Sequence, residues 1–218
     1  MLYLIGMGLE EGDMTLKGVE ALKKCKEVFT DVYTSIPYRI FGKKAEREIV
    51  ESDFLVKLAE KKDVALLVPG DPLFATTHIS LVSEARKRGI EVQVIHAPSV
   101  MNAVARTGLS PYRFGRTVTV GSEIFPSDME KIEKNMKCEL HTLCLFDPSV
   151  DPRECLKALF QVVREKIVLC SKLGTREEKV YYGKIEKILK NPLKKPVCAV
   201  IPGKLLFYER EFLEVFSI

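Results

Sequence analysis

The chain has 218 residues, of which 46% are hydrophobic and 29% are charged, and its formal net charge at pH 7 is +4. This composition is typical of a globular protein and excludes collagen-like, low-complexity and disordered chains. The 34 basic and 30 acidic side chains are mixed along the sequence. Because no basic cluster stands out, nothing in the sequence indicates a partner made of DNA or RNA.

The sequence predicts neither a membrane span nor an export signal. The longest stretch without a charged residue, 92–105, contains Gln93, His96 and Pro98, so it cannot form a spanning helix. Residues 1–9 are apolar but include no basic residue. The six cysteines form no C-x-x-C pair. We therefore expect reduced, buried thiols in a cytoplasmic protein, and no metal site.

In the first half, short apolar runs alternate with helical patterns, which indicates a parallel sheet with crossover helices. Segment 36–50 has no clear pattern. Strands are predicted at residues 2–5, 28–33, 64–68 and 92–95, and helices at residues 15–25, 54–59, 76–88 and directly after Pro98-Ser99.

Residues 109–115 have the composition of a linker. We predict an N-terminal domain at 1–111, a linker at 112–116 and a C-terminal domain at 117–218. Hairpins among the last strands would make the second sheet mixed. Its predicted strands are 117–120, 143–146, 167–170, 180–182, 197–201 and 205–208, and its helices include one opened by a capping box at Ser127 and Glu130, one capped by Asp151 and one near 185–189.

Residues suited to a small polar ligand follow three strands of the first domain. They are the segments Gly6-Met7-Gly8, Pro69-Gly70-Asp71-Pro72 and His96-Ala97-Pro98-Ser99. The carboxyl ends of parallel strands border the ligand crevice of such folds. Each segment also has a purely structural interpretation: a tight turn, a solvated Asp71, or a Ser99 that caps a helix. The coincidence of all three favours a binding crevice.

Two common nucleotide motifs do not fit the sequence. Gly12 comes one position too late to complete a G-x-G-x-x-G fingerprint with Gly6 and Gly8. The chain contains no G-x-x-x-x-G-K-[ST] loop, which excludes nucleotide hydrolysis of the P-loop type.

Taken together, these segments resemble the diphthine synthases, most closely the archaeal ones, which belong to the tetrapyrrole methylase superfamily. The resemblance extends over nearly the whole chain and rests on residues 4–9, 15–18, 33–35, 69–78, 95–99, 141–143 and 201–205. It implies two α/β domains, the first with a mostly parallel sheet and the second with a mixed sheet. It also implies that S-adenosylmethionine binds in the cleft between the domains.

The resemblance further implies which residues bind the cofactor. These are Leu9, Asp71, Phe74, Ser99 and Val100 in the first domain, and Phe146, Leu173 and Val197 in the second. No catalytic acid or base is implied. His78 and His96 are candidates to assist proton transfer, although a structural role is favoured for each.

The reaction implied by the resemblance is methyl transfer from S-adenosylmethionine to a modified histidine of translation elongation factor 2. Three transfers to the amino group of its aminocarboxypropyl chain would give the trimethylammonium group of diphthine, with S-adenosylhomocysteine as the second product. The resemblance also implies a homodimer.

Two alternatives remain open at this point. A corrin methyltransferase of the same superfamily is disfavoured, because residues 8–13 do not form the G-P-G-D turn that is usual in those enzymes. A non-catalytic nucleotide-binding module could use Gly6 and Gly8. Selective binding of NAD over S-adenosylhomocysteine would favour this module.

Overall fold

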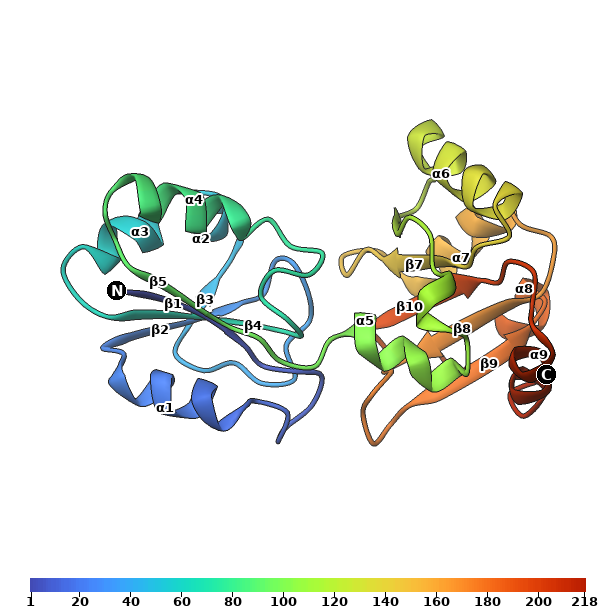
Figure 1. Ribbon diagram of the computed structural model, residues 1–218, viewed down its shortest axis with the longest axis horizontal. Helices are drawn as coiled ribbons and strands as arrows, with labels where there is room; N and C mark the ends of the chain where they lie inside the picture. The colour runs from blue at the N-terminus through green and yellow to red at the C-terminus, as the bar shows by residue number, and fades with distance from the viewer. The chain divides into compact units, whose positions relative to one another are not determined.

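The computed structural model describes all residues, 1–218, and divides into two compact units, Met1–Ala103 and Val104–Ile218 (Figure 1). The division lies before the linker that we predicted at 112–116. That segment belongs to the second unit, where the Gly115 N–H donates a hydrogen bond to the His141 carbonyl at 2.8 Å.

The first unit is built on a five-stranded sheet in the order β3-β2-β4-β1-β5, and all its strand pairs are parallel. Every residue of β1 and β4 is buried, as expected for central strands of a sheet covered on both faces. The predicted parallel sheet is therefore confirmed. Its strands are β1 (Leu2–Gly6), β2 (Glu27–Asp31), β3 (Lys43–Ala45), β4 (Val64–Val68) and β5 (Val92–Ile95).

Helices cover both faces of this sheet, with α1 on one face and α2, α3 and α4 on the other (Figure 1). Alternate residues of β4 point to opposite faces, so Leu66 and Leu67 belong to different hydrophobic clusters. The helices are α1 (Leu16–Lys24), α2 (Arg47–Val50), α3 (Phe54–Ala59), α4 (Ile79–Lys87) and α5 (Val100–Ala103).

Three details of the first unit differ from the predicted elements. The second strand ends at Asp31, two residues early, because the Asp31 carboxylate accepts hydrogen bonds from the N–H groups of Tyr33 and Thr34 and turns the chain. The unassigned segment 36–50 contains β3 and α2. Helix α4 begins at Ile79 rather than at residue 76, because the preceding residues belong to an irregular loop.

The second unit contains a mixed sheet, as predicted, and its five strands have the order β6-β7-β10-β8-β9. The pair β6–β7 is parallel and the other pairs are antiparallel. The elements are β6 (Val118–Val120), β7 (Thr142–Phe146), β8 (Ile167–Ser171), β9 (Lys179–Gly183), β10 (Val197–Ile201), α6 (Pro126–Lys137), α7 (Pro152–Phe160), α8 (Ile185–Ile188), α9 (Phe207–Glu214) and the short 3₁₀ helices η1 (Val104–Thr107) and η2 (Pro111–Arg113).

The strand predicted at 205–208 is wrong, because its second half forms the start of α9 and residues 205 and 206 have no strand structure. The Glu209 carboxylate accepts a hydrogen bond from the Leu206 N–H at 2.8 Å, which caps the first turn of the helix. Phe207 and Tyr208 are exposed on this helix rather than buried in a sheet.

The predicted capping box at Ser127 and Glu130 is also wrong. Helix α6 begins two residues earlier than that box requires, at Pro126, and its N-cap residue Phe125 makes no side-chain hydrogen bond. Proline is favoured at the first helical position, where no N–H donor is needed. The cap predicted at Asp151 is confirmed, since its carboxylate accepts a hydrogen bond from the Arg153 N–H at 2.7 Å.

No helix of the chain combines the length and the apolar character that crossing a membrane requires.

Candidate functional site

The structure brings together the three glycine- and proline-containing loops that follow β1, β4 and β5. Gly8 and Gly70 form an antiparallel bridge, with N···O distances of 3.2 and 2.8 Å. A Cβ atom added to Gly6 would lie 2.7 Å from the Cβ of Ala97 and 2.7 Å from the carbonyl oxygen of Gly70. Only a residue without a side chain allows the loops to approach this closely.

Asp13 fixes the backbone that follows Gly8. Its Oδ2 accepts hydrogen bonds from the N–H groups of Leu9 at 2.9 Å and Glu10 at 3.2 Å. Gly8 itself has a φ of +77°, a conformation that favours glycine. Sequence reasoning identified Leu9 but missed Asp13. The signal was present, because an Asp close to a glycine turn often accepts hydrogen bonds from nearby N–H groups.

The Asp71 side chain is held on both of its carboxylate oxygens and is only 14% exposed. Oδ1 accepts a hydrogen bond from the Leu73 N–H at 3.0 Å, and Oδ2 lies 2.7 Å from Nδ1 of His96. An ionised carboxylate only accepts hydrogen bonds, so Nδ1 carries the ring proton. The His96 side chain is 69% exposed, and its Nε2 has no hydrogen-bond partner in the protein.

Phe74 and Ser99 also belong to these loops. The Phe74 N–H contacts the Asp71 carbonyl at 3.3 Å, and the Phe74 side chain is half-buried. Ser99 is buried, and its hydroxyl accepts a hydrogen bond from the Met101 N–H at 3.3 Å. Ser99 therefore helps to start the short helix α5, in which Val100 is the first residue and is half-buried. The structural interpretation of Ser99 as a helix cap accounts for these contacts.

His78 lies wholly inside the first unit. Its Nδ1 is 2.9 Å from the Pro72 carbonyl oxygen and its Nε2 is 3.2 Å from Oδ2 of Asp31. The second contact has an ion-pair distance without the alignment of a hydrogen bond. Burial raises the pKa of Asp31, but the contacts with His78 and Thr34 lower it more strongly, so that it ends below its usual value. Neither ring nitrogen of His78 faces solvent, so its contacts are those of a structural residue.

The other three predicted residues lie together in the second unit, at one end of its sheet. Phe146 ends β7, Val197 begins β10, and Leu173 follows β8 by two residues. Because β10 pairs with both β7 and β8, the three residues lie on or directly after neighbouring strands. All three are buried.

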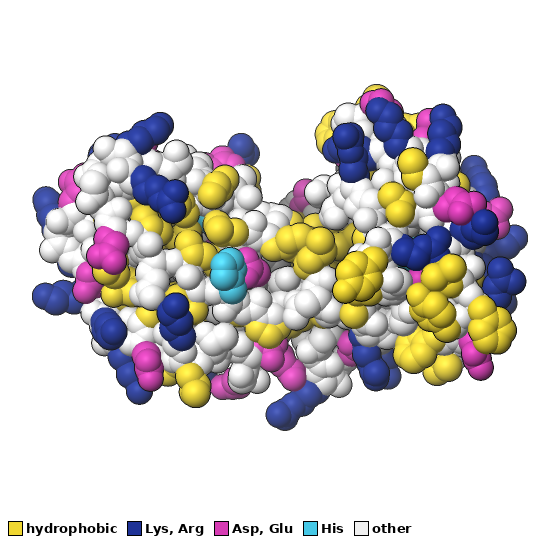
Figure 2. All heavy atoms as spheres, in the orientation of Figure 1, with side chains coloured by type: hydrophobic (Ala, Val, Ile, Leu, Met, Phe, Trp, Pro, Cys, Tyr) yellow, Lys and Arg dark blue, Asp and Glu magenta, His cyan; other side chains and the backbone are white.

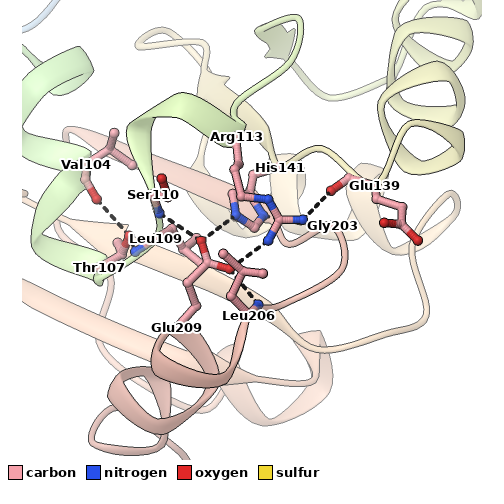
Figure 3. A network of polar contacts seen from close by, with 10 residues as sticks. All are labelled: Val104, Thr107, Leu109, Ser110, Arg113, Glu139, His141, Gly203, Leu206 and Glu209. Carbon is pink, nitrogen blue, oxygen red and sulfur yellow. Dashed lines mark hydrogen bonds and ion pairs between the residues drawn. The ribbon is translucent and has the colours of Figure 1, made fainter.

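A second polar cluster, around Glu209, was not predicted as a site (Figure 3). Oε1 of Glu209 lies 3.1 Å from Nε2 of His141, and Oε2 lies 3.1 Å from Nη1 of Arg113. The Gly203 N–H donates to Nδ1 of His141 at 2.9 Å, so Nε2 carries the ring proton. Burial lowers the pKa of His141, and the nearby Glu209 opposes this effect only in part. The cluster joins η2, the residue preceding β7, and α9 within the second unit.

Comparison with known families identifies the fold. The family described as Tetrapyrrole (Corrin/Porphyrin) Methylases matches residues 1–189. The chain belongs to the tetrapyrrole methylase family. Among curated members, "Diphthine synthase" of Methanocaldococcus jannaschii is 34% identical, with 98% of each chain covered. "Diphthine methyl ester synthase 2" of Candida albicans is 47% identical over 69% of this chain and 56% of its own length.

Solved structures of tetrapyrrole methylases lead to the same assignment. A crystal structure of diphthine synthase has a TM-score of 0.91 at 31% identity, and the match covers 99% of this chain and 95% of the other. The crystal structure of a putative diphthine synthase from Entamoeba histolytica has a TM-score of 0.87 at 33% identity, with 100% and 98% covered. The predicted family, fold and enzyme class are confirmed: the chain is a methyltransferase related to diphthine synthases.

Proposed function

We propose that this methyltransferase transfers methyl groups from S-adenosylmethionine to the modified histidine of translation elongation factor 2. The acceptor is the amino group of the aminocarboxypropyl chain, and three transfers give the trimethylammonium group of diphthine. The observation that carries the proposal is the similarity to an archaeal diphthine synthase over 98% of both chains. Similarity confined to one of the two units would have supported only a shared fold.

The loops of the first unit offer groups that suit this cofactor. Asp71 presents a carboxylate held in one orientation, which can accept hydrogen bonds from the hydroxyl or ammonium groups of the cofactor. The glycines beside it let a ligand approach the backbone closely. We assign Leu9, Asp71, Phe74, Ser99 and Val100 to cofactor binding, and we extend the assignment to Phe146, Leu173 and Val197 of the second unit.

The reaction requires little acid–base chemistry from the protein. The bound sulfonium supplies an electrophilic methyl group, and its thioether leaves without a proton. An acceptor amine with a pKa of about 8–10 loses its proton to solvent readily enough at neutral pH. The task of the chain is then to align the nitrogen with the S–CH₃ bond, and such positioning can lower the barrier by about 7–11 kcal/mol.

The proposal includes a homodimer that works in the cytoplasm, where translation factors are modified. Exposed apolar side chains support a protein–protein surface. Figure 2 shows hydrophobic side chains gathered around α9, where Phe207 is 82% and Val215 is 77% exposed. Analytical ultracentrifugation of the purified chain tests this part, and a monomer at micromolar concentration would contradict it.

Mass spectrometry of the acceptor protein tests the reaction. Elongation factor 2 that carries the aminocarboxypropyl histidine is incubated with this protein and S-adenosylmethionine. We expect a gain of three methyl masses on that histidine. An unchanged mass, or methylation of a corrin macrocycle instead, would contradict the proposal.

Calorimetry with S-adenosylhomocysteine tests the assigned site. We expect Asp71→Asn to weaken binding by roughly ten-fold or more, because a hydrogen bond to a charged group contributes about 1.5–3 kcal/mol. Asp53→Asn is a matched control, since Asp53 forms surface ion pairs with Lys57 and Arg88. Equal affinities in both variants would remove Asp71 from the site, and selective binding of NAD would remove the cofactor assignment.

A further inference from the structure

The loop of residues 71–77, here called the Asp71 loop, carries two of the assigned cofactor residues, Asp71 and Phe74. It has neither helical nor strand structure. Ala75 within it has a φ of +54°, a conformation that residues with a Cβ atom rarely adopt. Such a conformation persists only where the surrounding structure imposes it. Contacts within the loop and from its surroundings therefore fix its shape.

The Pro72 carbonyl is the point at which the loop is held. It accepts a hydrogen bond from the Thr76 hydroxyl at 2.8 Å and lies 2.9 Å from Nδ1 of His78. Pro72 directly follows Asp71. Since the His78 side chain is fully buried, its contact with the carbonyl is shielded from competing water.

The other side of the His78 ring faces Asp31, at the end of β2. The Asp31 side chain is fully buried, and its Oδ2 lies 3.2 Å from Nε2 of His78. The N–H groups of Tyr33 and Thr34 donate to Oδ1 of Asp31 at 2.7 and 3.0 Å, and the Thr34 hydroxyl contacts Oδ2. Because Asp31 is paired with Ala45 of β3 in the sheet, its backbone is fixed.

We propose that His78 is a positioning residue, which links the end of β2 to the Asp71 loop and so places Asp71 and Phe74 before the cofactor binds. The expected effect of His78 on cofactor binding rests on the proposed function. The attachment of the loop to His78 through Pro72 does not depend on the cofactor.

The hydrogen-bond partners of the His78 ring indicate which ring nitrogen carries a proton. The Pro72 carbonyl can only accept a hydrogen bond, so Nδ1 carries a proton. The Asp31 carboxylate accepts hydrogen bonds from three other donors, and its 3.2 Å contact with Nε2 has an ion-pair distance without hydrogen-bond alignment.

Two matched variants separate the two contacts. In His78→Asn the amide nitrogen takes the place of Nδ1 and can still donate to Pro72. In His78→Gln it takes the place of Nε2 and can still reach Asp31. We expect His78→Gln to weaken S-adenosylhomocysteine binding by roughly ten-fold, the loss of about one hydrogen bond, while His78→Asn stays within about three-fold of the wild type. Equal affinities in the two variants would overturn the proposal.

A ligand-free readout keeps the inference separate from the proposed function. Hydrogen exchange is measured at the N–H groups of Leu73 and Phe74, which bond within the loop. Faster exchange in His78→Gln than in His78→Asn supports the positioning role even if no S-adenosylhomocysteine binds. Unchanged exchange in both variants overturns it.

One measurement on the wild-type protein covers the case in which a variant does not fold. The ¹⁵N spectrum of labelled histidines distinguishes a protonated ring nitrogen from an unprotonated one. We expect Nδ1 of His78 to carry a proton. A ring with an unprotonated Nδ1 would overturn the attachment to Pro72.

Discussion

The three histidines show how neighbouring groups, rather than residue type, decide a role. His78 lies between a carbonyl and a carboxylate, and His96 is exposed with its Nδ1 on Asp71. His141 is buried and accepts a hydrogen bond from the Gly203 N–H. The sequence could indicate that His78 and His96 lie near the loops, because both fall in short motifs. It could not indicate which ring nitrogen is bonded, since the partners Asp31 and Gly203 lie far away in the chain.

At the same scale, His141 makes stability depend on pH. Its pKa in the folded protein lies below the ordinary value of 6.5, so the unfolded chain binds a proton more readily. Stability should therefore decrease as pH falls from about 7 to 5. The pKa of Glu209 is also lowered, from 4.5, and its contribution is lost only at more acidic pH.

Urea unfolding measured between pH 7 and 5 checks this expectation. His141→Gln should unfold with a smaller pH dependence in this range, because the titrating ring is removed. Gln161→Ala is the control and should keep the wild-type slope, since it changes an exposed side chain that does not titrate. A steeper dependence of stability on pH in His141→Gln would contradict the direction assigned to the His141 pKa shift.

Gly6 gives a sharper prediction about the contact between loops. An added Cβ would lie 2.7 Å from two groups, so Gly6→Ala should lower the free energy of unfolding by about 1–3 kcal/mol and weaken S-adenosylhomocysteine binding. Gly121→Ala is the control, because the nearest atom to its added Cβ is 3.9 Å away. Chemical denaturation and calorimetry provide the two readouts. Equal stability of the two variants would show that the loops can separate without cost.

At the scale of elements, two substitutions test a helix cap that the structure confirms, Asp151, against one that it does not, Ser127. Asp151→Ala removes the side chain that accepts the Arg153 N–H, so α7 should lose about 1 kcal/mol of stability. Ser127→Ala alters an exposed residue inside α6 that caps nothing, and should change stability by less than about 0.5 kcal/mol. Thermal unfolding of both variants measures the difference. A larger effect at Ser127 would restore the capping box as the start of α6.

Buried strands were the elements that local sequence patterns predicted best. The strands at 64–68 and 197–201 have the predicted bounds, because five consecutive apolar residues with turn signals on both sides fit a central strand. The same kind of apolar run led to the wrong strand prediction at 205–208. Such a run does not show whether its side chains are buried in a sheet or exposed on a helix. The decisive group, Glu209, bonds to residues about a hundred positions away.

At the scale of the whole molecule, short motifs in chain order were enough to predict the family, whereas cofactor residues could be assigned from them only by analogy. The glycines and prolines that begin the loops have distinctive local signals. Asp31 and Asp13 fix those loops, yet each is an ordinary acidic residue in the sequence. Their importance arises from packing between segments, which no single segment encodes.

The two units have separate hydrophobic cores, which predicts that a core substitution acts within its own unit. Leu66 and Leu156 are both fully buried, the first in a cluster of the first unit and the second in that of the second unit. Each change to Ala should cost about 2–5 kcal/mol of stability. By native-state hydrogen exchange, Leu66→Ala should speed exchange in residues 1–103, and Leu156→Ala in residues 104–218. Equal acceleration of both units by either variant would show instead that the chain opens as one cooperative body.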